Sequence, residues 1–414
     1  MFDLAKAISK NAAPVIPVVN GPKSCTLIYQ SQECLSLVEE IFLFEGWNEP
    51  TIQKEALKST KLDREDLHDI ILLELNQSSN VVEDARRLAS QIPPHKGVIV
   101  IGKEDAISTL RALKDMGFYY VFWPVNKQEL ADFIIHVNNN LRTFSGVSKQ
   151  RKAKRVAVVG TKGGIGTTMI TAELASVFSS QGTDTILVDH QNADSNIDIL
   201  LSLKNLQRHN LTDMTMPIHE LDDESAVGFL TNVRSHLRLL ALEGGESDLQ
   251  VLNFSQTLCQ LLTRNTNFIL EDYSASVAFR PDPLILSERS DVVIVVLEPS
   301  VASVRTARKL IERLNNLQIS DSNKLRIIPL LNIHRPLNAF SLSKQEVAQY
   351  LQTPIAIELE YNRNIARLII EGKRAHKHDK QMQQAFDELG RLINGQANTN
   401  SKTPLSWFKK VFNR

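Results

Sequence analysis

The stretch "VVGTKGGIGTTMI", from Val158 to Ile170, joins the end of an apolar run to the start of an amphipathic one. The preceding "RVAVV" is typical of a buried strand, and the residues after the glycines place large apolar side chains on one helical stripe. A glycine-rich turn in this context directs backbone N–H groups and a helix N-terminus toward an anion. We therefore predict a phosphate-binding loop rather than an ordinary turn, with these nucleotide-binding residues: Gly163, Gly164, Ile165, Gly166, Thr167 and Thr168.

The loop departs from the common pattern G-x-x-x-x-G-K-[ST], because Thr167 stands where the lysine is expected. Thr168 keeps the hydroxyl that binds a magnesium ion. A missing positive charge at the phosphoryl transition state typically costs about 3–4 kcal/mol. We expect the loop to bind ATP or ADP with Mg²⁺ and to hydrolyse ATP slowly, if at all. The earlier lysine, Lys162, either has a separate function or is a solvated loop residue.

The chain of 414 residues is too long for one ordinary core, so two or three domains are expected. Apolar runs that alternate with helical patterns predict an α/β fold throughout. Residues 23–144 carry the runs "CTLIYQ", "DIILLEL", "GVIVIG" and "YYVFWPV". Residues 155–394 predict a larger doubly wound, mostly parallel sheet from "RVAVVG", "DTILVD", "LRLLAL", "NFILED", "DVVIVVLEP", "LRIIPLLN" and a short run near "PIAIEL".

Polar segments separate these domains. Residues 1–22 predict a flexible leader, with a short amphipathic helix near its start as the alternative. Residues 145–154 form a basic linker, and residues 395–404 form a polar tether. The basic segment "EGKRAHKHDKQ", residues 371–381, predicts a solvated helix end, and nucleic-acid contact there is the less favoured alternative.

Composition excludes several classes of protein. A formal net charge of zero removes any overall attraction to nucleic acid or acidic membranes. The three cysteines form no C-x-x-C pair, which argues against a disulfide framework, a zinc site or an iron–sulfur cluster and fits a reducing cytoplasm. No apolar run reaches the roughly 18 residues that span a bilayer.

The motif "KGGIGTT" resembles the deviant Walker A motif, K-G-G-x-G-K-[ST]-T, of the MinD/ParA ATPases. "LVDHQNADSNIDILL" resembles the family's D-x-D switch segment, and "FILEDYSAS" resembles its Walker B strand and second switch. The resemblance implies that Thr168, Asp189 and Asp272 hold Mg²⁺, directly or through water. It also implies that Asn332 lies near the adenine, and that Lys162 crosses a homodimer interface to the phosphates bound by the partner subunit.

This resemblance covers about residues 155–373 and departs from the family pattern in a second place. The second acid of the D-x-D segment, which relatives use near the attacking water, is replaced by Gln191. We therefore assign no catalytic residue, and Lys162 and Asp189 remain the two candidates.

The first domain resembles a response-regulator receiver in the order and length of its strands. A receiver needs an acid pair after its first strand, a phosphate-accepting aspartate and a lysine before a proline. This chain has "SQE" after the first strand, Glu74 at the acceptor position and Trp123 before the proline. We expect no phosphorylation. Glu74 either mimics a charged state or is a plain surface or packed acid, and Trp123 serves packing or an interface.

The end of the chain, "LSWFKKVFNR", predicts an amphipathic helix over residues 405–414. MinD relatives end in a similar membrane-targeting helix, and a basic helix of this kind lies in a membrane interface. Docking on a protein groove and an unstructured end are the alternatives. One such tail is a marginal anchor, whereas two tails on a dimer gain from effective concentration. The membrane-contacting residues would be Leu405, Trp407, Phe408, Lys409, Lys410, Val411 and Phe412.

A MinD/ParA-like domain behind a degenerate receiver resembles the CpaE/TadZ family of pilus-assembly proteins. The resemblance implies a cytoplasmic, homodimeric factor, peripheral on the inner membrane and polar, that marks the site of tight-adherence (Flp, type IVb) pilus assembly. Its partners would include the secretion ATPase and other pilus-assembly proteins. The alternatives are a cycling ATPase that positions a flagellum, a division site or DNA, and a scaffold whose loop binds no nucleotide.

Overall fold

The computed structural model describes residues 21–54, 67–143, 152–192, 194–213, 220–245, 247–274, 281–317 and 325–396 of the chain. The chain forms two compact units, each built on its own parallel sheet. Most of the predicted leader, linker and tether lies outside the described residues, as does the whole predicted helix at 405–414.

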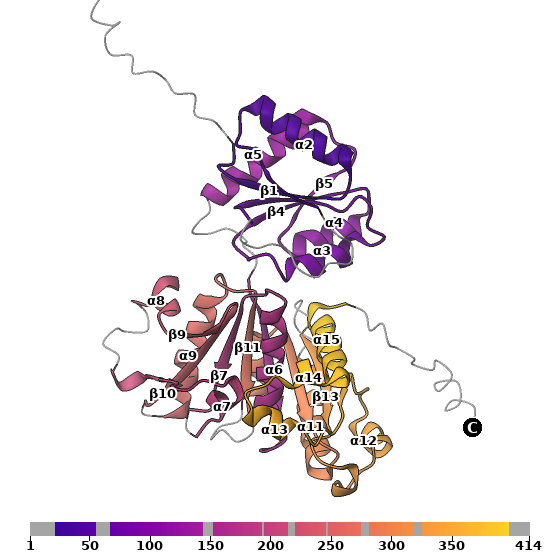
Figure 1. Ribbon diagram of the computed structural model, residues 1–414. Helices are drawn as coiled ribbons and strands as arrows, with labels where there is room; N and C mark the ends of the chain where they lie inside the picture. Colours follow the sequence, from indigo (N-terminus) through magenta and orange to yellow (C-terminus); the bar gives the residue numbers. More distant parts are fainter. Residues whose placement is uncertain are drawn as a thin grey trace, which may run out of the picture. The chain divides into compact units, whose positions relative to one another are not determined.

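The first unit has, among the described residues, a parallel sheet with the strand order β2-β1-β3-β4-β5, which is the order of flavodoxin-like folds. Helices α2 and α5 cover one face of this sheet, and α3 and α4 cover the other (Figure 1). The elements are β1 (Cys25–Tyr29), α2 (Gln32–Glu45), β2 (Thr51–Lys54), β3 (Ile70–Glu74), α3 (Val81–Ala89), β4 (Gly97–Gly102), α4 (Ile107–Asp115), β5 (Tyr119–Phe122) and α5 (Lys127–Thr143).

The four predicted apolar runs of this unit form β1, β3, β4 and β5. Strands β3 and β4 are buried along their whole length, because helices cover both faces of a parallel sheet. The edge strand β2 was missed, since its sequence "TIQK" is polar and its residues alternate between half-buried and exposed. A short polar edge strand ending in lysine is a common way to protect a sheet edge.

The second unit has the strand order β14-β13-β12-β6-β11-β7-β10-β8, and β9 pairs antiparallel with β10. The α/β class and the mostly parallel sheet are therefore confirmed. The strands are β6 (Lys154–Gly160), β7 (Thr185–Asp189), β8 (His209–Asn210), β9 (Leu230–Arg234), β10 (Leu237–Glu243), β11 (Phe268–Tyr273), β12 (Val292–Leu297), β13 (Arg326–Asn332) and β14 (Ile357–Leu359).

Helices fill the crossovers between these strands. They are α6 (Thr167–Ser180), α7 (Ile197–Leu201), α8 (Asp223–Val227), α9 (Asp248–Leu262), α10 (Pro283–Arg289), α11 (Val301–Leu317), α12 (Lys344–Leu351), α13 (Ile365–Ile370), α14 (Ala375–His378) and α15 (Lys380–Asn394), with short 3₁₀ turns at Leu211–Asp213 and Leu337–Ala339. The predicted runs form β6, β7, β10, β11, β12, β13 and β14. The weakly apolar β8 and β9 were not predicted.

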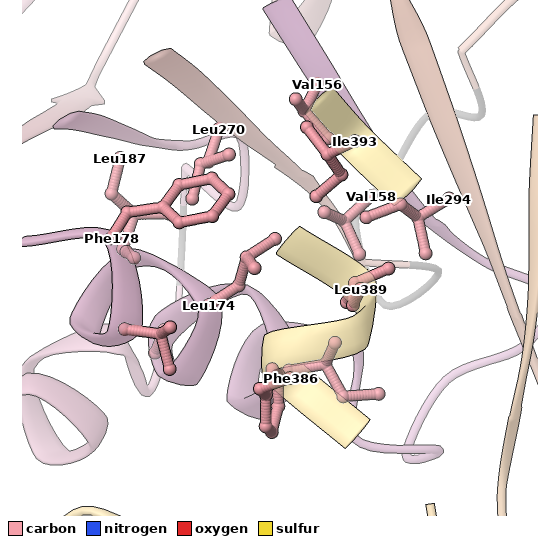
Figure 2. Close-up of a cluster of buried hydrophobic side chains, with 14 of the residues drawn as sticks. Val156, Val158, Leu174, Phe178, Leu187, Leu270, Ile294, Phe386, Leu389 and Ile393 are labelled. Atoms are coloured by element: carbon pink, nitrogen blue, oxygen red, sulfur yellow. The ribbon is translucent and has the colours of Figure 1, made fainter. Parts of the chain in front are cut away.

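Helices α6 and α15 cover one face of the large sheet and hold the core together. Figure 2 shows Leu174 and Phe178 of α6 with Phe386, Leu389 and Ile393 of α15 among side chains of the strands beneath. Each large apolar side chain buried in this way stabilises the fold by about 1.5–3 kcal/mol. The packing fixes α6, and therefore the glycine-rich loop at its start, against β6.

Parallel pairing brings the carboxyl ends of five strands to one edge of this sheet. Asp272 of β11 is in register with Val158 of β6 and with Asp189 of β7. The residues that follow β6 and β12 lie at the same edge, and Asn332 ends β13 there. Ligands of open α/β sheets bind at this edge, so the fold collects the predicted site residues where a ligand would be.

Candidate nucleotide-binding site

The glycine-rich loop connects β6 to α6 as the sequence predicted. Gly164 and Gly166 have φ angles of +76° and +85°, which are strained for any residue with a side chain. Gly166 is the N-cap of α6, and among the described residues no side chain caps this helix start. The first backbone N–H groups of α6 are therefore available to an anion, which is the arrangement a phosphate cradle needs.

Asn332 braces this loop from the end of β13. Its Nδ2 donates to the Ile165 carbonyl at 2.7 Å, and the side chain is buried. A Cβ on Gly166 would lie 2.8 Å from the same Nδ2, so a larger residue there would have to displace the Asn332 side chain in addition to adopting a strained φ. We expected Asn332 near an adenine, and the structure gives it a contact with the loop itself, which the sequence pattern did not indicate.

The two threonines at the start of α6 have different environments. Thr167 is buried, and its carbonyl accepts a hydrogen bond from the Thr171 hydroxyl at 2.9 Å. Thr168 is partly exposed at the first turn. The position that carries a lysine in the common pattern is thus an uncharged, packed residue, so the first turn of α6 supplies no cation of its own.

The loop lysine, Lys162, forms an ion pair within its own chain. Its Nζ lies 2.7 Å from Oε1 of Glu298, the residue directly after β12, and its side chain is 47% exposed. Burial of Glu298 opposes ionisation, but hydrogen bonds from His334, Lys162 and Ser300 outweigh it and lower the pKa of this carboxyl to about 2. Glu298 is therefore ionised at neutral pH and pairs with Lys162 within the same chain.

Sequence reasoning missed Glu298, although an acid directly after the buried run "VVIVVL" was a usable signal. The loop is tied to the same strand end a second time. The Thr161 hydroxyl lies 2.7 Å from the Ser303 hydroxyl of α11, and Ser303 Oγ accepts from the Glu298 backbone N–H at 2.9 Å. The glycine-rich loop and the start of α11 are thus connected through buried hydroxyls.

Asp272 has an unsatisfied carboxylate oxygen. The side chain is fully buried, Oδ1 accepts from the Thr171 hydroxyl at 3.3 Å, and Oδ2 has no hydrogen-bond partner among the described residues. Burial and the negative charge of Asp189 raise the pKa of Asp272 to about 7, although hydroxyls of Thr168 and Thr171 favour the ionised form. An orphan buried oxygen costs free energy unless a ligand satisfies it.

Both oxygens of Asp189, in contrast, have protein partners. Oδ2 lies 2.5 Å from Nη2 of Arg208, and Oδ1 accepts from the Gln191 backbone N–H at 3.0 Å. Arg208 also donates to the carbonyls of Gln191 and Leu242 at 3.0 and 3.3 Å. Arg208 thus fixes the switch segment around Asp189, and no motif in the sequence indicated this role.

The residues present fit a magnesium ion in part. A carboxylate and a hydroxyl are the hard oxygen ligands that Mg²⁺ prefers, and Asp272 with Thr168 provides them. Asp189 would take part only through water or after Arg208 moved away. When bound, Mg²⁺ would neutralise charge on the phosphates. Gln191, which stands at the position of the second switch acid, supplies no carboxylate to such an ion, and its side chain donates to the Asp194 carbonyl at 3.0 Å.

A buried polar cluster lies behind the switch segment. Glu271 of β11 accepts from Arg155 at 2.6 Å, from Gln256 at 2.6 Å and from the Tyr273 hydroxyl at 2.9 Å, and its Oε2 lies 3.1 Å from His190. Burial opposes ionisation of Glu271, but Arg155 and His190 outweigh it and hold its pKa well below the usual range. The cluster links His190, next to Asp189, to β6 and α9, and sequence reasoning missed it.

The prediction of a solvated helix end at 371–381 was wrong at its centre. His376 is buried, and its Nδ1 lies 2.5 Å from Oε2 of Glu173 in α6. The same carboxylate accepts from the backbone N–H groups of Ala375 and His376 at 3.1 Å. This buried acid in α6 therefore fixes the start of α14, and the histidine belongs to the packing of the unit.

In the first unit, Glu74 is fully buried at the end of β3, which excludes the surface acid among the expected alternatives and agrees with the packed acid. Its carboxylate accepts from the backbone N–H groups of Gln30 and Ser31 at 2.7 and 2.9 Å, from the Ser31 hydroxyl at 2.5 Å and from Asn76 at 2.7 Å. The residues after β1 that replace an acid pair thus supply donors for Glu74. Trp123 is partly buried and packs on the core of this unit.

Comparison with known proteins gives a consistent result for the second unit. The profile of the CobQ/CobB/MinD/ParA nucleotide binding domain matches residues 156–376. The septum site-determining protein MinD of Helicobacter pylori is 22% identical over 254 residues, which cover 58% of this chain and 90% of that protein.

Two solved structures are similar to this chain over more than half of its length. The MinC:MinD cell division complex of Aquifex aeolicus is 19% identical, covers 59% of this chain and 97% of the matched chain, and has a TM-score of 0.47. MinD of Pyrococcus horikoshii, solved with Mg-ADP, is 17% identical, covers 58% and 96%, and has a TM-score of 0.43. In the part of this chain that the structure describes, no helix is long and apolar enough to cross a membrane.

Proposed function

Because the chain belongs to the CobQ/CobB/MinD/ParA nucleotide-binding family, we propose that its second unit binds ATP or ADP with Mg²⁺ at the loop 162–168. The observation that carries this proposal is the orphan Oδ2 of Asp272, which is buried beside an uncapped helix start. A cation satisfies the first feature and a phosphate the second. Thr168 and Asp272 are the proposed magnesium ligands.

We propose that hydrolysis is slow. Thr167 places no charge on the transferred phosphoryl group, and Gln191 cannot act as the second switch acid. Asp189 is the remaining acid of the switch segment. Its Oδ2 lies 2.5 Å from Nη2 of Arg208, which neutralises its negative charge. Positioning and charge stabilisation supply almost all catalysis in phosphoryl transfer, and three of the groups that would provide them are absent or engaged.

Nucleotide would act here by joining two subunits through Lys162. In the single chain this lysine neutralises Glu298. To reach phosphates on the partner subunit it must leave that carboxylate, and a triphosphate offers it more negative charge than one glutamate does. ATP would therefore favour the dimer, and two copies of the C-terminal segment would then act together on a membrane.

The pairing of this ATPase-like unit with a receiver-like unit supports a role in positioning, as in the CpaE/TadZ family of pilus-assembly proteins. Four donors of the first unit already satisfy the Glu74 carboxylate at the position where a receiver accepts phosphate. The first unit is therefore suited to docking rather than to phosphotransfer. We propose a polar, peripheral membrane factor that docks the secretion ATPase or another pilus-assembly protein. The membrane segment 405–414 of this proposal lies outside the described residues.

Calorimetry on the full chain tests the core of the proposal. MgATP should bind with an affinity that falls when EDTA removes the metal and that falls to a similar level in Asp272→Asn without EDTA. Asp387→Asn, which changes a half-buried acid of α15, is the matched control. A site without detectable heat at millimolar MgATP would leave only the scaffold, and steady turnover would identify a cycling ATPase.

A further inference from the structure

Helix α2 presents two large apolar side chains to solvent at its carboxyl end. Leu43 is 85% exposed and Phe44 is 84% exposed, whereas Val38, Ile41 and Phe42 of the same helix are buried in the core. Packing of the first unit therefore does not require an apolar residue at either position. An exposed apolar pair with a polar rim is typical of an interaction site.

Acidic side chains surround this pair. Glu39 precedes Leu43 by four residues and Glu40 precedes Phe44 by four, so each acid lies beside an apolar side chain on the helix surface. Glu33, about two helical turns before Glu40, is also exposed. We call these five residues the α2 face.

Helix α5 lies beside α2 on the same face of the sheet (Figure 1). It contributes one cation to the α2 face, Lys127, whose Nζ lies 2.5 Å from Glu40. One lysine against the three glutamates of the α2 face leaves this surface negative, so a partner must be both apolar and basic.

This charge argues against two occupants. An anionic lipid surface would be repelled, because glutamates flank both apolar side chains. A second copy of the α2 face, docked about a two-fold axis, would place the same glutamates opposite one another. What fits is a short segment that combines aromatic or aliphatic side chains with lysine or arginine.

We propose that the α2 face binds residues 402–414 of this chain. That segment, "KTPLSWFKKVFNR", has four cations and no acid. Its five large apolar residues could cover Leu43 and Phe44 while Lys409 and Lys410 meet the glutamates. Charge complementarity of this kind fixes which partner binds and how it is oriented.

Docking would withhold the segment from a membrane, so the first unit would control when the second is anchored. Only this consequence rests on the proposed function. The docking itself needs neither nucleotide nor lipid, and it can therefore be measured in the absence of both.

Cross-linking in the full chain tests the contact. The three native cysteines are buried, so introduced thiols react selectively. Ser36→Cys on α2 is combined with Asn413→Cys and treated with a short bismaleimide. The matched control combines Ser108→Cys, an exposed serine of α4, with Asn413→Cys. A tethered segment that docks reaches about millimolar effective concentration, so we expect about tenfold more product from the first pair.

Surface variants then show what holds the segment. Leu43→Ser with Phe44→Ser should remove the excess product, and Ile107→Ser, which changes a 76% exposed isoleucine of α4, should leave it intact. Glu39→Lys should also remove it, and Lys409→Glu added to Glu39→Lys should restore it. Rescue by a swapped charge pair is not expected from a change in folding.

Three results would overturn the proposal. The first is equal product from the Ser36→Cys and Ser108→Cys pairs. The second is a product that joins two copies through Ser36→Cys alone, which would make the α2 face a self-association surface. The third is loss of flotation with phosphatidylglycerol vesicles in the Leu43→Ser, Phe44→Ser variant, which would make lipid the occupant. Failure of nucleotide or vesicle binding alone leaves the cross-linking yields unchanged.

Discussion

Each unit has a carboxylate at or near the carboxyl end of a buried parallel strand, and the surroundings of the two carboxylates are opposite. Glu74 at the end of β3 accepts hydrogen bonds from two backbone N–H groups, a hydroxyl and an amide of its own unit. Asp272, near the end of β11, interacts with the hydroxyls of Thr168 and Thr171 and keeps one oxygen without a hydrogen-bond partner among the described residues. The first carboxylate is satisfied by its own unit, whereas the second keeps an unpaired oxygen that we propose a ligand satisfies.

Under the proposed function, the difference shows how one fold class can provide a phosphate site in one unit and fill the corresponding sheet edge in the other. In both units a parallel sheet delivers an acid to the edge where ligands bind. The surroundings of the acid depend on the neighbouring loop, which supplies either donors for the acid itself or free backbone N–H groups for an anion. The "QSQ" segment after β1 supplies donors, whereas the "GTKGGIG" segment after β6 leaves a helix start open.

The largest effect is expected from removing the satisfied carboxylate. Glu74→Ala leaves several buried donors unpaired and should lower the free energy of unfolding of the first unit by about 3–5 kcal/mol. Denaturant titration followed by circular dichroism measures it. Glu33→Ala, at an exposed acid of α2, should change stability by less than about 0.5 kcal/mol. A loss below 1 kcal/mol for Glu74→Ala would contradict the view that this site is sealed.

The unsatisfied carboxylate should behave in the opposite way. Burial raises the pKa of Asp272 from the ordinary 3.8 to about 7, so the folded state binds a proton that the unfolded state has released. Stability of the nucleotide-free chain should therefore fall as pH rises from 4 to 7 and stay low above pH 7. This pKa difference corresponds to a cost of at most about 4 kcal/mol.

Asp272→Asn should thus stabilise the nucleotide-free chain by about 2–4 kcal/mol at pH 8 and by little at pH 4. Thermal melts at the two pH values provide the measurement. The substitution should also abolish the rise in melting temperature that MgATP gives the unaltered chain. A destabilised variant at pH 8 would show that Oδ2 has a partner after all and would remove the contrast with Glu74.

A third experiment asks whether the missing positive charge at position 167 is what limits hydrolysis at the proposed nucleotide site. Thr167→Lys restores the lysine of the common pattern, and single-turnover hydrolysis should become about 10–100-fold faster. The gain should stay below that of a complete site, because Gln191 and the Asp189–Arg208 pair remain. Thr167→Met has a comparable size without the charge and is the control. Equal rates in the two variants would show that charge at this position is not what limits hydrolysis.

The smallest effect concerns the lysine held within its own subunit. Glu298→Gln should release Lys162 and strengthen ATP-dependent dimerisation by about threefold to tenfold, since one charge-assisted hydrogen bond no longer competes. Sedimentation velocity with MgATP measures the change. Glu312→Gln, which removes an exposed acid of α11, should have no effect. Weaker dimers in Glu298→Gln would instead make this carboxylate part of the interface.

Much of this architecture was predictable because its signals are local. The runs that form β3, β4 and β12 are apolar apart from the terminal Glu74 of β3, and the glycine pattern after β6 needs only neighbouring residues to be recognised. The elements that were missed, such as β2 and β9, lie at the edges of the sheets. Their sequences are short and mostly polar, because an edge strand remains partly in water, so no apolar run marks them.

The sequence by itself determined the α/β class, the phosphate-type loop and the replacement of two charged residues by Thr167 and Gln191, because each depends on residues that are adjacent in the chain. Only the tertiary structure decided how the remaining charges are used. Lys162 meets Glu298 across 136 positions of sequence, and Glu74 meets Gln30 across 44. Such partners are chosen by which strand ends and loops the parallel sheet brings together, and no local pattern carries that information.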